Sequence, residues 1–220
     1  MVWFNTAEYT PLQLGLFAVG TFFWLVSYVC IIIGIRKNKF VEMPAGVICA
    51  NITWEFIWAF IHPQNMGEFI GLGYKAWAVI DVYFIYATYK YGKEQTIPEF
   101  RPYFNHLITF GLVSWFIVQY FYIQCGYDNG IGANSAYIIN ILISLTYIML
   151  IMRIKDIKLL SFTSGWAKGL GTGLISIMCF LKWPENTFLL SMCVICAIMD
   201  VYYIYIFRRR VKELTAVSSV

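Results

Sequence analysis

Seven long apolar segments dominate the sequence, and they restrict the chain to one class of fold. The hydrocarbon core of a bilayer is about 30 Å thick, so a helix that crosses it needs roughly 20 mainly apolar residues. The segments cover about 12–35, 45–61, 70–89, 107–125, 136–152, 165–181 and 187–207. Backbone groups in lipid must be hydrogen-bonded internally, and alternating strands of about ten residues are absent. We therefore expect an all-α integral membrane protein with seven transmembrane helices, in a single domain over 1–220.

The composition excludes both a soluble domain and a disordered chain. Hydrophobic residues make up 60% of the 220 residues and charged residues 13%, whereas ordinary globular chains have about 45–50% and 25%. A soluble domain of this size buries only part of its surface, and disordered segments are poor in apolar residues. Residues 1–13 contain no Lys or Arg, so we expect no cleavable signal peptide.

The basic residues predict the orientation of the bundle, because cytosolic loops of membrane proteins carry an excess of Lys and Arg. They gather in the first, third and fifth loops, at the start of the sixth helix and in the tail: Arg36, Lys37, Lys39, Lys90, Lys93, Arg101, Arg153, Lys155, Lys158, Lys168, Arg208, Arg209, Arg210 and Lys212. Lys75 and Lys182 fall toward the opposite face. We expect the N-terminus outside or in the lumen and the C-terminus in the cytosol, in a bacterial plasma membrane or an endoplasmic reticulum membrane. The net charge of the chain is +4, but its basic residues lie between the apolar segments, so the expected partner is the lipid bilayer and not nucleic acid.

An internal repeat relates the two halves of the chain. Residues 81–86, Asp-Val-Tyr-Phe-Ile-Tyr, recur 119 positions later as Asp-Val-Tyr-Tyr-Ile-Tyr. Residues 63–65, Pro-Gln-Asn, recur as Pro-Glu-Asn 121 positions later. We expect two parallel three-helix units, about 12–89 and 136–207, joined by a linker helix at 107–125. Such a 3+1+3 repeat favours a central cavity between its halves.

Three acidic residues lie within the apolar segments, where charge is unfavourable. Glu55, Asp81 and Asp200 each fall in a predicted helix, and a carboxylate at mid-bilayer costs about 2.5–3.5 kcal/mol even on the lenient insertion scale. Helical spacing places polar and aromatic residues on or beside the same helix faces: Asn51, Trp54 and Trp58 near Glu55, Trp77 near Asp81, and Tyr203 near Asp200. We expect these side chains to face the interior of the bundle.

This pattern indicates acid chemistry in an apolar pocket. Burial favours the neutral, protonated carboxyl group, and the faces of aromatic rings stabilise a passing cation. Protonation of an alkene or an epoxide needs both a protonated acid and surroundings that stabilise a cation. A set of helix-to-helix hydrogen bonds with neutral acids fits the same pattern.

Other chemistries lack their sequence patterns. No aspartate-rich cluster suits Mg²⁺ and a diphosphate, and no glycine-rich phosphate loop occurs, so we expect neither a metal site nor a cofactor. Gly169, Gly171 and Gly173 alternate in the sixth predicted helix and predict close helix packing.

The residues around Glu55 resemble the signature of a known family. Residues 43–44 are Met-Pro, 49–55 are Cys-Ala-Asn-Ile-Thr-Trp-Glu, and 61–63 are Ile-His-Pro. Trp166, the Leu-Lys-Trp run at 181–183, and Asp200 with Tyr203 follow in the family's order. Over about 44–210 the chain resembles small integral-membrane terpene cyclases. Their known members act in fungal meroterpenoid and indole-diterpene pathways of the pyripyropene and paxilline types, and bacterial relatives act on prenylated indoles.

The resemblance implies a reaction and roles for residues. The essential glutamate and aspartate of the family map onto Glu55 and Asp200. Protonation of a terminal epoxide or alkene would start cyclisation of a lipophilic prenylated substrate, without a metal or loss of diphosphate. A prenyltransferase and an epoxidase would act upstream.

On this hypothesis Asp200 is the general acid and Glu55, held by Asn51, assists it. Trp54, Trp58, Trp77, Trp166 and Tyr203 would shape the chain and shield cations. The chain departs from the fungal pattern at Asp81, where the family has a neutral residue, and at Lys182, which replaces an arginine.

Two other functions fit the sequence. The 3+1+3 repeat is typical of small seven-helix carriers, and Asp81 and Asp200 at equal depth would suit proton coupling. A structural subunit whose buried acids only connect helices is the third alternative.

Overall fold

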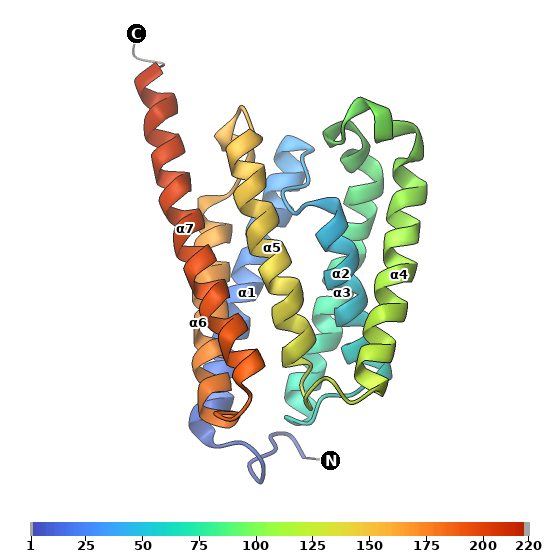
Figure 1. Cartoon of the computed structure of the whole chain (residues 1–220), viewed down its shortest axis with the longest axis vertical. Coiled ribbons are helices and arrows are strands. Elements are labelled where there is room, and N and C mark those ends of the chain that lie inside the picture. The colour runs from blue at the N-terminus through green and yellow to red at the C-terminus, as the bar shows by residue number, and fades with distance from the viewer. Residues whose placement is uncertain (1, 218–220) are drawn as a thin grey trace.

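A computed structural model describes the backbone of residues 2–217 and the side chains of residues 2–213, and the regular secondary structure of this part of the chain is all helical (Figure 1). Its main helices are α1 (Pro11–Asn38), α2 (Ala45–Phe56), α3 (Glu68–Tyr91), α4 (Phe104–Gln124), α5 (Ala133–Arg153), α6 (Phe162–Lys182) and α7 (Thr187–Val217). A main helix thus lies over each of the seven predicted segments, and the all-helical fold is confirmed.

Two segments differ from the expected pattern. The predicted break at 90–106 is helical in part, with 3₁₀ turns at Gly92–Gln95 and Pro98–Tyr103. The second apolar segment ends in a π-helical turn at Ile57–Ile61, which buries Trp58. Short 3₁₀ turns are frequent as connectors, and π-turns have no simple sequence signal.

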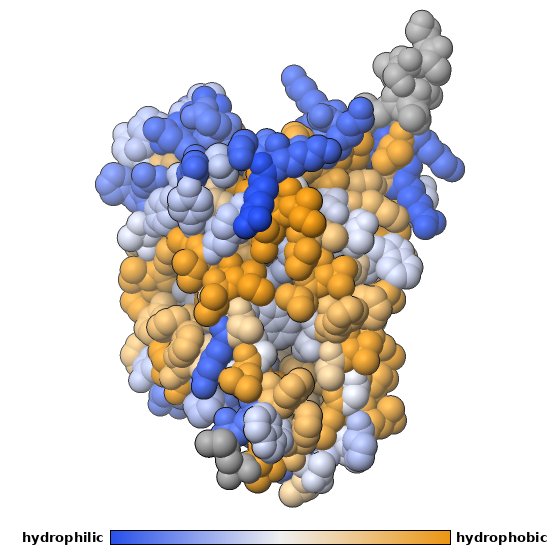
Figure 2. Space-filling view, turned by 180° about the vertical axis from the view of Figure 1, so that it is seen from behind, coloured by the Kyte–Doolittle hydropathy of each residue, from blue (hydrophilic) through white to orange (hydrophobic). Residues whose placement is uncertain are grey.

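Five stretches of the described chain are candidate membrane spans by their length and hydropathy. These are Pro11–Asn38, Glu68–Gln95, Pro98–Gln124, Ala133–Arg153 and Thr187–Glu213. Ala45–Ile61 is apolar but shorter. The protein therefore has several helices that fit a bilayer. Figure 2 shows many hydrophobic residues across the middle of the face that it draws.

The helices surround α5, which is the most buried of those that cross the bundle. Helix α5 packs against α7 on one side and α2 on the other, and α6 packs against both α1 and α7. Helix α4 lies at the edge against α2 (Figure 1). Helices α1 and α3 touch each other at few positions.

Two glycines let α1 and α6 approach closely. A Cβ atom on Gly20 would lie 2.9 Å from the Gly171 carbonyl oxygen, and one on Gly171 would lie 2.6 Å from the Gly20 carbonyl oxygen. The close packing predicted for Gly171 is confirmed. For Gly173 it is wrong, because a Cβ there would meet nothing within 4 Å.

Most basic residues lie at one end of the bundle. The C-terminal ends of α1, α3, α5 and α7 lie together at the upper end (Figure 1), and hydrophilic residues gather at that end in Figure 2. Lys168 is an exception. We expected it among the cytosolic basic residues, but the structure buries it inside the bundle. It is 7% exposed, since it lies more than one turn inside α6.

A buried glutamate connects two loops at this end. Glu42, between α1 and α2, is 2% exposed, and its Oε2 accepts the backbone N–H of Ser161, just before α6, at 3.1 Å. Its Oε1 has no hydrogen-bond partner in the described part of the chain. Burial raises the pKa of the Glu42 carboxyl to about 8, which the Ser161 hydrogen bond only partly offsets.

We predict that Gly171→Val destabilises the protein by about 1–3 kcal/mol, because the added methyl groups force α1 and α6 apart. Gly173→Val, two residues along the same helix, has open space and is the matched control. Thermal unfolding in detergent micelles measures both. Equal midpoints for the two variants would contradict the packing described here.

We predict that stability falls as the pH rises from about 5 to about 9. The folded state holds a proton on Glu42 up to about pH 8, whereas an unfolded glutamate releases it near pH 4.3. The folded state therefore binds more protons in this window, and raising the pH favours unfolding. Glu42→Gln, which is neutral throughout, should flatten the dependence of melting temperature on pH. Exposed Glu99→Gln should leave it unchanged.

Candidate active site

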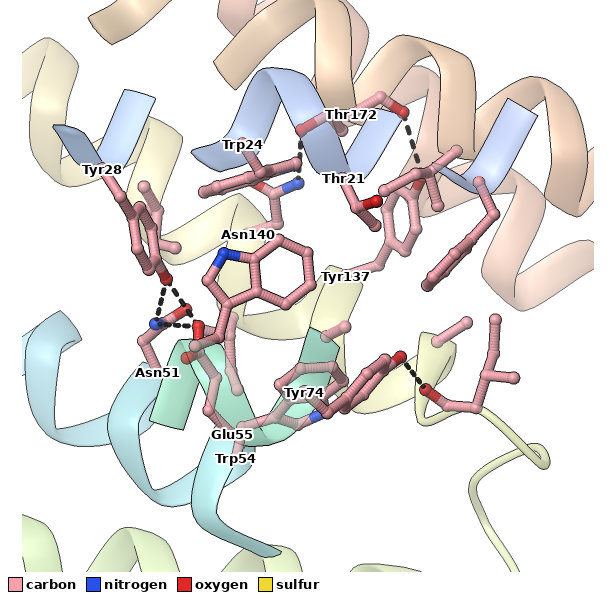
Figure 3. A pocket seen from close by; sticks show the side chains of 18 residues that line it. Thr21, Trp24, Tyr28, Asn51, Trp54, Glu55, Tyr74, Tyr137, Asn140 and Thr172 are labelled. Carbon is pink, nitrogen blue, oxygen red and sulfur yellow. Dashed lines mark hydrogen bonds between the residues drawn. The ribbon is translucent and has the colours of Figure 1, made fainter. Parts of the chain in front are cut away.

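A cavity of about 110 Å³ lies between α1, α2, α3, α5 and α6 (Figure 3). Its walls are mostly aromatic: Phe17, Trp24, Tyr28, Trp54, Tyr74, Trp77 and Tyr137. Glu55 is the one carboxyl group among the residues that line it, and the other polar groups are Thr21, Asn51, Asn140 and Thr172. The cavity therefore presents a single acid to a largely apolar space.

One oxygen of Glu55 is held and the other is not. Glu55 Oε1 accepts the hydroxyl of Tyr28 at 2.5 Å and the amide Nδ2 of Asn51 at 3.0 Å (Figure 3). Asn51 Nδ2 also donates to the Tyr28 hydroxyl at 2.7 Å, which closes a triangle of hydrogen bonds. Oε2 is buried and accepts no hydrogen bond from the residues that the structure describes. This triangle fixes the carboxyl group and leaves Oε2 as the oxygen free to carry a proton.

A second carboxyl group lies behind the first. Asp81, on α3, is 2% exposed and close enough to Glu55 to interact with it electrostatically. Both Asp81 oxygens lack hydrogen-bond partners within the described part of the chain. Two carboxylates this close repel each other strongly, so the pair is stable only if it holds a proton.

The loop before α5 fixes one aromatic wall. The Trp54 indole N–H donates to Ser135 Oγ at 2.9 Å and to the Gly132 carbonyl at 3.3 Å. Ser135 in turn donates to Asp128. Burial raises the pKa of the Asp128 carboxyl, and the hydrogen bond from Ser135 and those from nearby backbone N–H groups oppose the rise. This network holds the Trp54 ring against the cavity.

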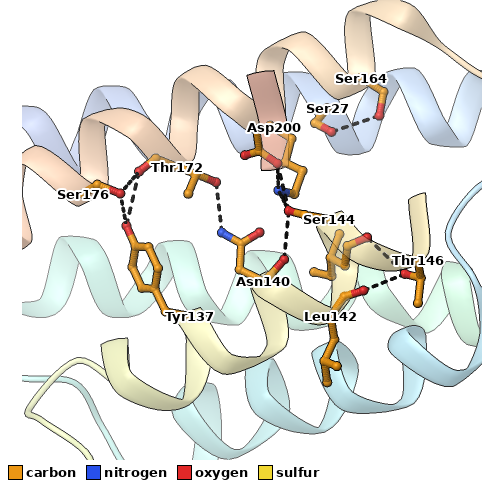
Figure 4. Close-up of polar contacts among 12 residues, drawn as sticks. Ser27, Tyr137, Asn140, Leu142, Ser144, Thr146, Ser164, Thr172, Ser176 and Asp200 are labelled. Carbon is orange, nitrogen blue, oxygen red and sulfur yellow. Dashed lines mark hydrogen bonds and ion pairs between the residues drawn. The ribbon is translucent and has the colours of Figure 1, made fainter. Parts of the chain in front are cut away.

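Asp200 belongs to a separate polar cluster. Its Oδ1 accepts Lys168 Nζ at 2.6 Å and Ser144 Oγ at 2.8 Å, and Lys168 Nζ also donates to Ser144 Oγ at 2.7 Å (Figure 4). The side chains of Lys168 and Asp200 are 9% and 8% exposed. An ammonium group at this distance stabilises the ionised carboxylate. Asp200 and Lys168 therefore form a buried ion pair.

The two clusters face each other across one tryptophan. Asp200, Lys168 and Ser144 border a second cavity of only about 10 Å³, about the space of one water molecule. Trp24 borders both cavities. Lys168 Nζ lies 5.7 Å from the centre of the Trp24 ring. The charge of the ion pair thus lies behind a wall of the larger cavity.

The structure brings together some of the predicted site residues and separates others. Asn51, Trp54, Glu55 and Trp77 line the larger cavity, and Tyr203 lines the smaller one with Asp200.

Two predicted substrate-binding residues lie away from these cavities. Trp58 is buried against Gly132, where a Cβ atom would lie 2.4 Å from its ring. Trp166 is 44% exposed on α6 and lines neither cavity, because the spacing of its helix turns it outward.

Sequence reasoning missed Tyr28, Trp24 and Lys168 as site residues. Tyr28 and Trp24 lie four residues apart on α1, where many aromatic residues hide the pattern. Lys168 had a usable signal, since it lies inside an apolar helix and another helix carries an acid that it can neutralise.

A comparison with protein families identifies the family of this chain. The family model of Pyr4-like transmembrane terpene cyclases matches residues 5–213, so the chain belongs to this family. It is a transmembrane protein of the terpene cyclase class.

Curated relatives carry the same name. The chain is 24% identical over 185 residues to the Pyr4-family terpene cyclase mfmH of Annulohypoxylon moriforme, covering 81% of this chain and 75% of the relative. It is 24% identical over 110 residues to the terpene cyclase cle7 of Aspergillus versicolor, covering 48% and 45%. It is 28% identical over 74 residues to the terpene cyclase macJ of Penicillium terrestre, covering 33% and 28%. No solved structure matches the chain.

We predict that Lys168→Met destabilises the protein by about 3–5 kcal/mol, because it leaves Asp200 buried without its counter-ion. The double variant Lys168→Met/Asp200→Asn removes both charges and should regain most of that loss. Thermal unfolding in detergent measures the series. A double variant less stable than Lys168→Met would contradict the ion pair.

Proposed function

We propose that the protein cyclises a prenylated substrate by protonating the terminal epoxide or alkene of its isoprenoid chain. The observation that carries this proposal is the Glu55 carboxyl group, held at one oxygen and free at the other, in a cavity with aromatic walls. Family membership favours this function over a carrier or a structural subunit.

Glu55 is the proton donor in this mechanism. Because Tyr28 and Asn51 both donate to Oε1, the acidic proton belongs on Oε2. When Oε2–H is given to an epoxide oxygen, the O–H bond forms as a carbon–oxygen bond of the ring breaks, and a cation develops on the substituted carbon. Burial in a water-poor cavity keeps the acid strong toward the substrate and prevents capture of the cation by water.

The aromatic walls guide the cation. Trp54, Trp77 and Trp24 present ring faces to the cavity, and a ring face attracts a nearby cation by about 0.5–2 kcal/mol. Successive double bonds of the chain attack the cation, and each closure moves it along the substrate. The final cation loses a proton, so the reaction as a whole is an isomerisation.

Asp81 stabilises Glu55 after the proton transfer. It lies beside Glu55 and Asn51. In this mechanism Asp81 keeps its own proton, so the pair carries one charge and not two while Glu55 is ionised. The proton released by the final cation returns to Glu55 Oε2 and restores the acid.

Asp200 has an electrostatic role. The sequence favoured it as the general acid, but its ion pair with Lys168 keeps it ionised and without a proton to give. It neutralises Lys168, whose charge would otherwise lie behind Trp24 and repel the substrate cation. On this proposal both Glu55 and Asp200 are essential, Glu55 as the proton donor and Asp200 as the counter-ion of Lys168.

The finer membrane arrangement is part of the proposal. Seven spans, with the N-terminus outside or in the lumen and the C-terminus in the cytosol, agree with the basic end of the bundle (Figure 2). Two parallel three-helix units, 12–89 and 136–207, are supported by the contacts between helices. Helix α1 packs on α6 as α5 packs on α2, and α2 packs on α3 as α6 packs on α7.

The substrate class follows from the cavity. Its apolar walls suit a lipophilic prenylated compound, which a prenyltransferase must supply, and an epoxidase as well where the epoxide is protonated. Neither step needs residues of this chain.

We predict that Glu55→Gln lowers the rate of cyclisation by at least about 10²-fold, the lower end of what a general acid contributes. The glutamine keeps the hydrogen bonds at the Oε1 position but has no acidic proton. Membranes that contain each variant are incubated with a phenol bearing a terminal epoxyfarnesyl chain. Chromatography separates the product, which has the mass of the substrate. Full activity of Glu55→Gln would refute the proposed acid, and Glu68→Gln at the exposed start of α3 is the matched control.

We predict that Asp200→Asn abolishes product and that Lys168→Met/Asp200→Asn restores part of it. The double variant removes the unpaired charge behind Trp24, whereas a proton donor lost at Asp200 could not be replaced in this way. An inactive double variant with normal membrane insertion would contradict the electrostatic role.

A further inference from the structure

A groove of about 230 Å³ lies on the outer surface of the bundle between α1 and α3. Its α1 side includes Phe22 and Leu25, and its α3 side includes Phe69 and Gly73. Phe22 and Phe69 are 59% and 52% exposed. Apart from the aromatic residues Tyr74 and Trp77, Thr21 is the one residue with a polar side chain among those that line it. The groove is therefore apolar and opens at the surface that a bilayer would cover.

The groove and the larger cavity share a wall one side chain thick. Phe17 and Thr21 of α1, and Tyr74 and Trp77 of α3, border both spaces. The Phe17 and Tyr74 rings are nearly parallel, with centroids 6.5 Å apart and planes 6° apart. Together they bridge α1 and α3 between lipid and cavity. Opening this wall requires the two rings to turn, which breaks the hydrogen bond that the Tyr74 hydroxyl donates to the Ile131 carbonyl at 3.2 Å.

The two halves of the bundle differ at this place. Helices α5 and α7 pack closely, with Tyr147 against Tyr203 at 5.8 Å and Ser144 hydrogen-bonded to Asp200. Helices α1 and α3 hold the corresponding positions of the first unit but meet at few points. The gap follows from α1, which packs on α6 through Gly20 and Gly171 and so lies away from α3.

The larger cavity is too small to hold a whole substrate, so part of the substrate must lie elsewhere. Small-molecule pockets usually measure about 300–1,000 Å³, and the cavity measures about 110 Å³. It takes the reacting end of an isoprenoid chain more readily than a whole substrate. The groove adjoins it, has the polarity of a hydrocarbon chain, and faces the phase in which such a chain dissolves.

We propose that this groove is a lateral portal that binds the isoprenoid chain of the substrate from the bilayer and admits its terminal end past Phe17 and Tyr74. The portal rests on the proposed function for its substrate. Gly73 lines the groove, and a Cβ there would meet nothing within 4 Å, so a larger side chain at this position has room to occupy the groove.

Binding is tested without reference to activity. Gly73→Cys in native-like membranes is reacted with a lipid-soluble maleimide, and mass spectrometry of the peptide that carries residue 73 measures labelling. Farnesol is expected to slow labelling at least about threefold, and hexadecanol at the same concentration to leave it unchanged. Gly15→Cys is the matched control, since Gly15 is also exposed with open space around it but lies outside the groove.

Equal protection of Gly73→Cys by farnesol and hexadecanol would overturn the proposal, because the groove would then be an ordinary lipid-facing surface. Protection of Gly15→Cys by farnesol would overturn it as well.

Activity is the second measurement. Gly73→Leu fills the groove without reaching the cavity, so kcat/KM for the epoxyfarnesyl phenol should fall at least about tenfold. Gly15→Leu should retain the wild-type value. An unchanged kcat/KM for Gly73→Leu would overturn the portal. If Gly73→Cys is protected by farnesol but wild-type protein forms no cyclised product, the binding site stands and the proposed function fails.

Discussion

The hydrogen bond from Tyr28 to Glu55 is the contact on which the candidate site depends. It joins α1 to α2 in the middle of an apolar bundle and, with Asn51, holds one oxygen of a buried acid. A carboxyl group in such surroundings is tolerated only when it has donors or stays neutral. The triangle of donors supplies the first condition at Oε1, and the proton that we place on Oε2 supplies the second. The arrangement that makes the buried Glu55 carboxyl group stable is therefore also the one that leaves it a proton to donate.

The buried aspartates of the two halves of the bundle have different surroundings. In the second half, Lys168 and Ser144 satisfy Asp200, so α5, α6 and α7 close around a neutral cluster with little empty space. In the first half, Asp81 has another acid beside it and no cation, and α1 lies away from α3. The groove therefore lies in the first half, and the larger cavity lies between the two halves. The second half supports the cavity, and the first half has the space beside it.

Part of the site could be predicted from local sequence. Asn51 and Glu55 are one helical turn apart, so their hydrogen bond follows from spacing, and so does the position of Trp54 beside them. The partner of Asp200 could not be derived in this way, because Lys168 and Asp200 are 32 residues apart on different helices. Lys168 was grouped with the cytosolic basic residues because it lies near the start of its helix, but the structure buries it. Trp166 was assigned to the site from the order of the family's segments, which does not reveal that its side chain is exposed on α6.

The sequence by itself determined that this is an all-helical membrane protein, because apolar segments of this length have no other stable arrangement in lipid. It also determined which acids are unusual, since charge in such segments requires a reason. Only the tertiary structure decided which acid faces the cavity and which is neutralised. That choice depends on how closely α1 approaches α6 at Gly20 and Gly171, and thereby on where Tyr28 and Trp24 lie. Contacts between helices distant in sequence leave no periodic signal in any one of them.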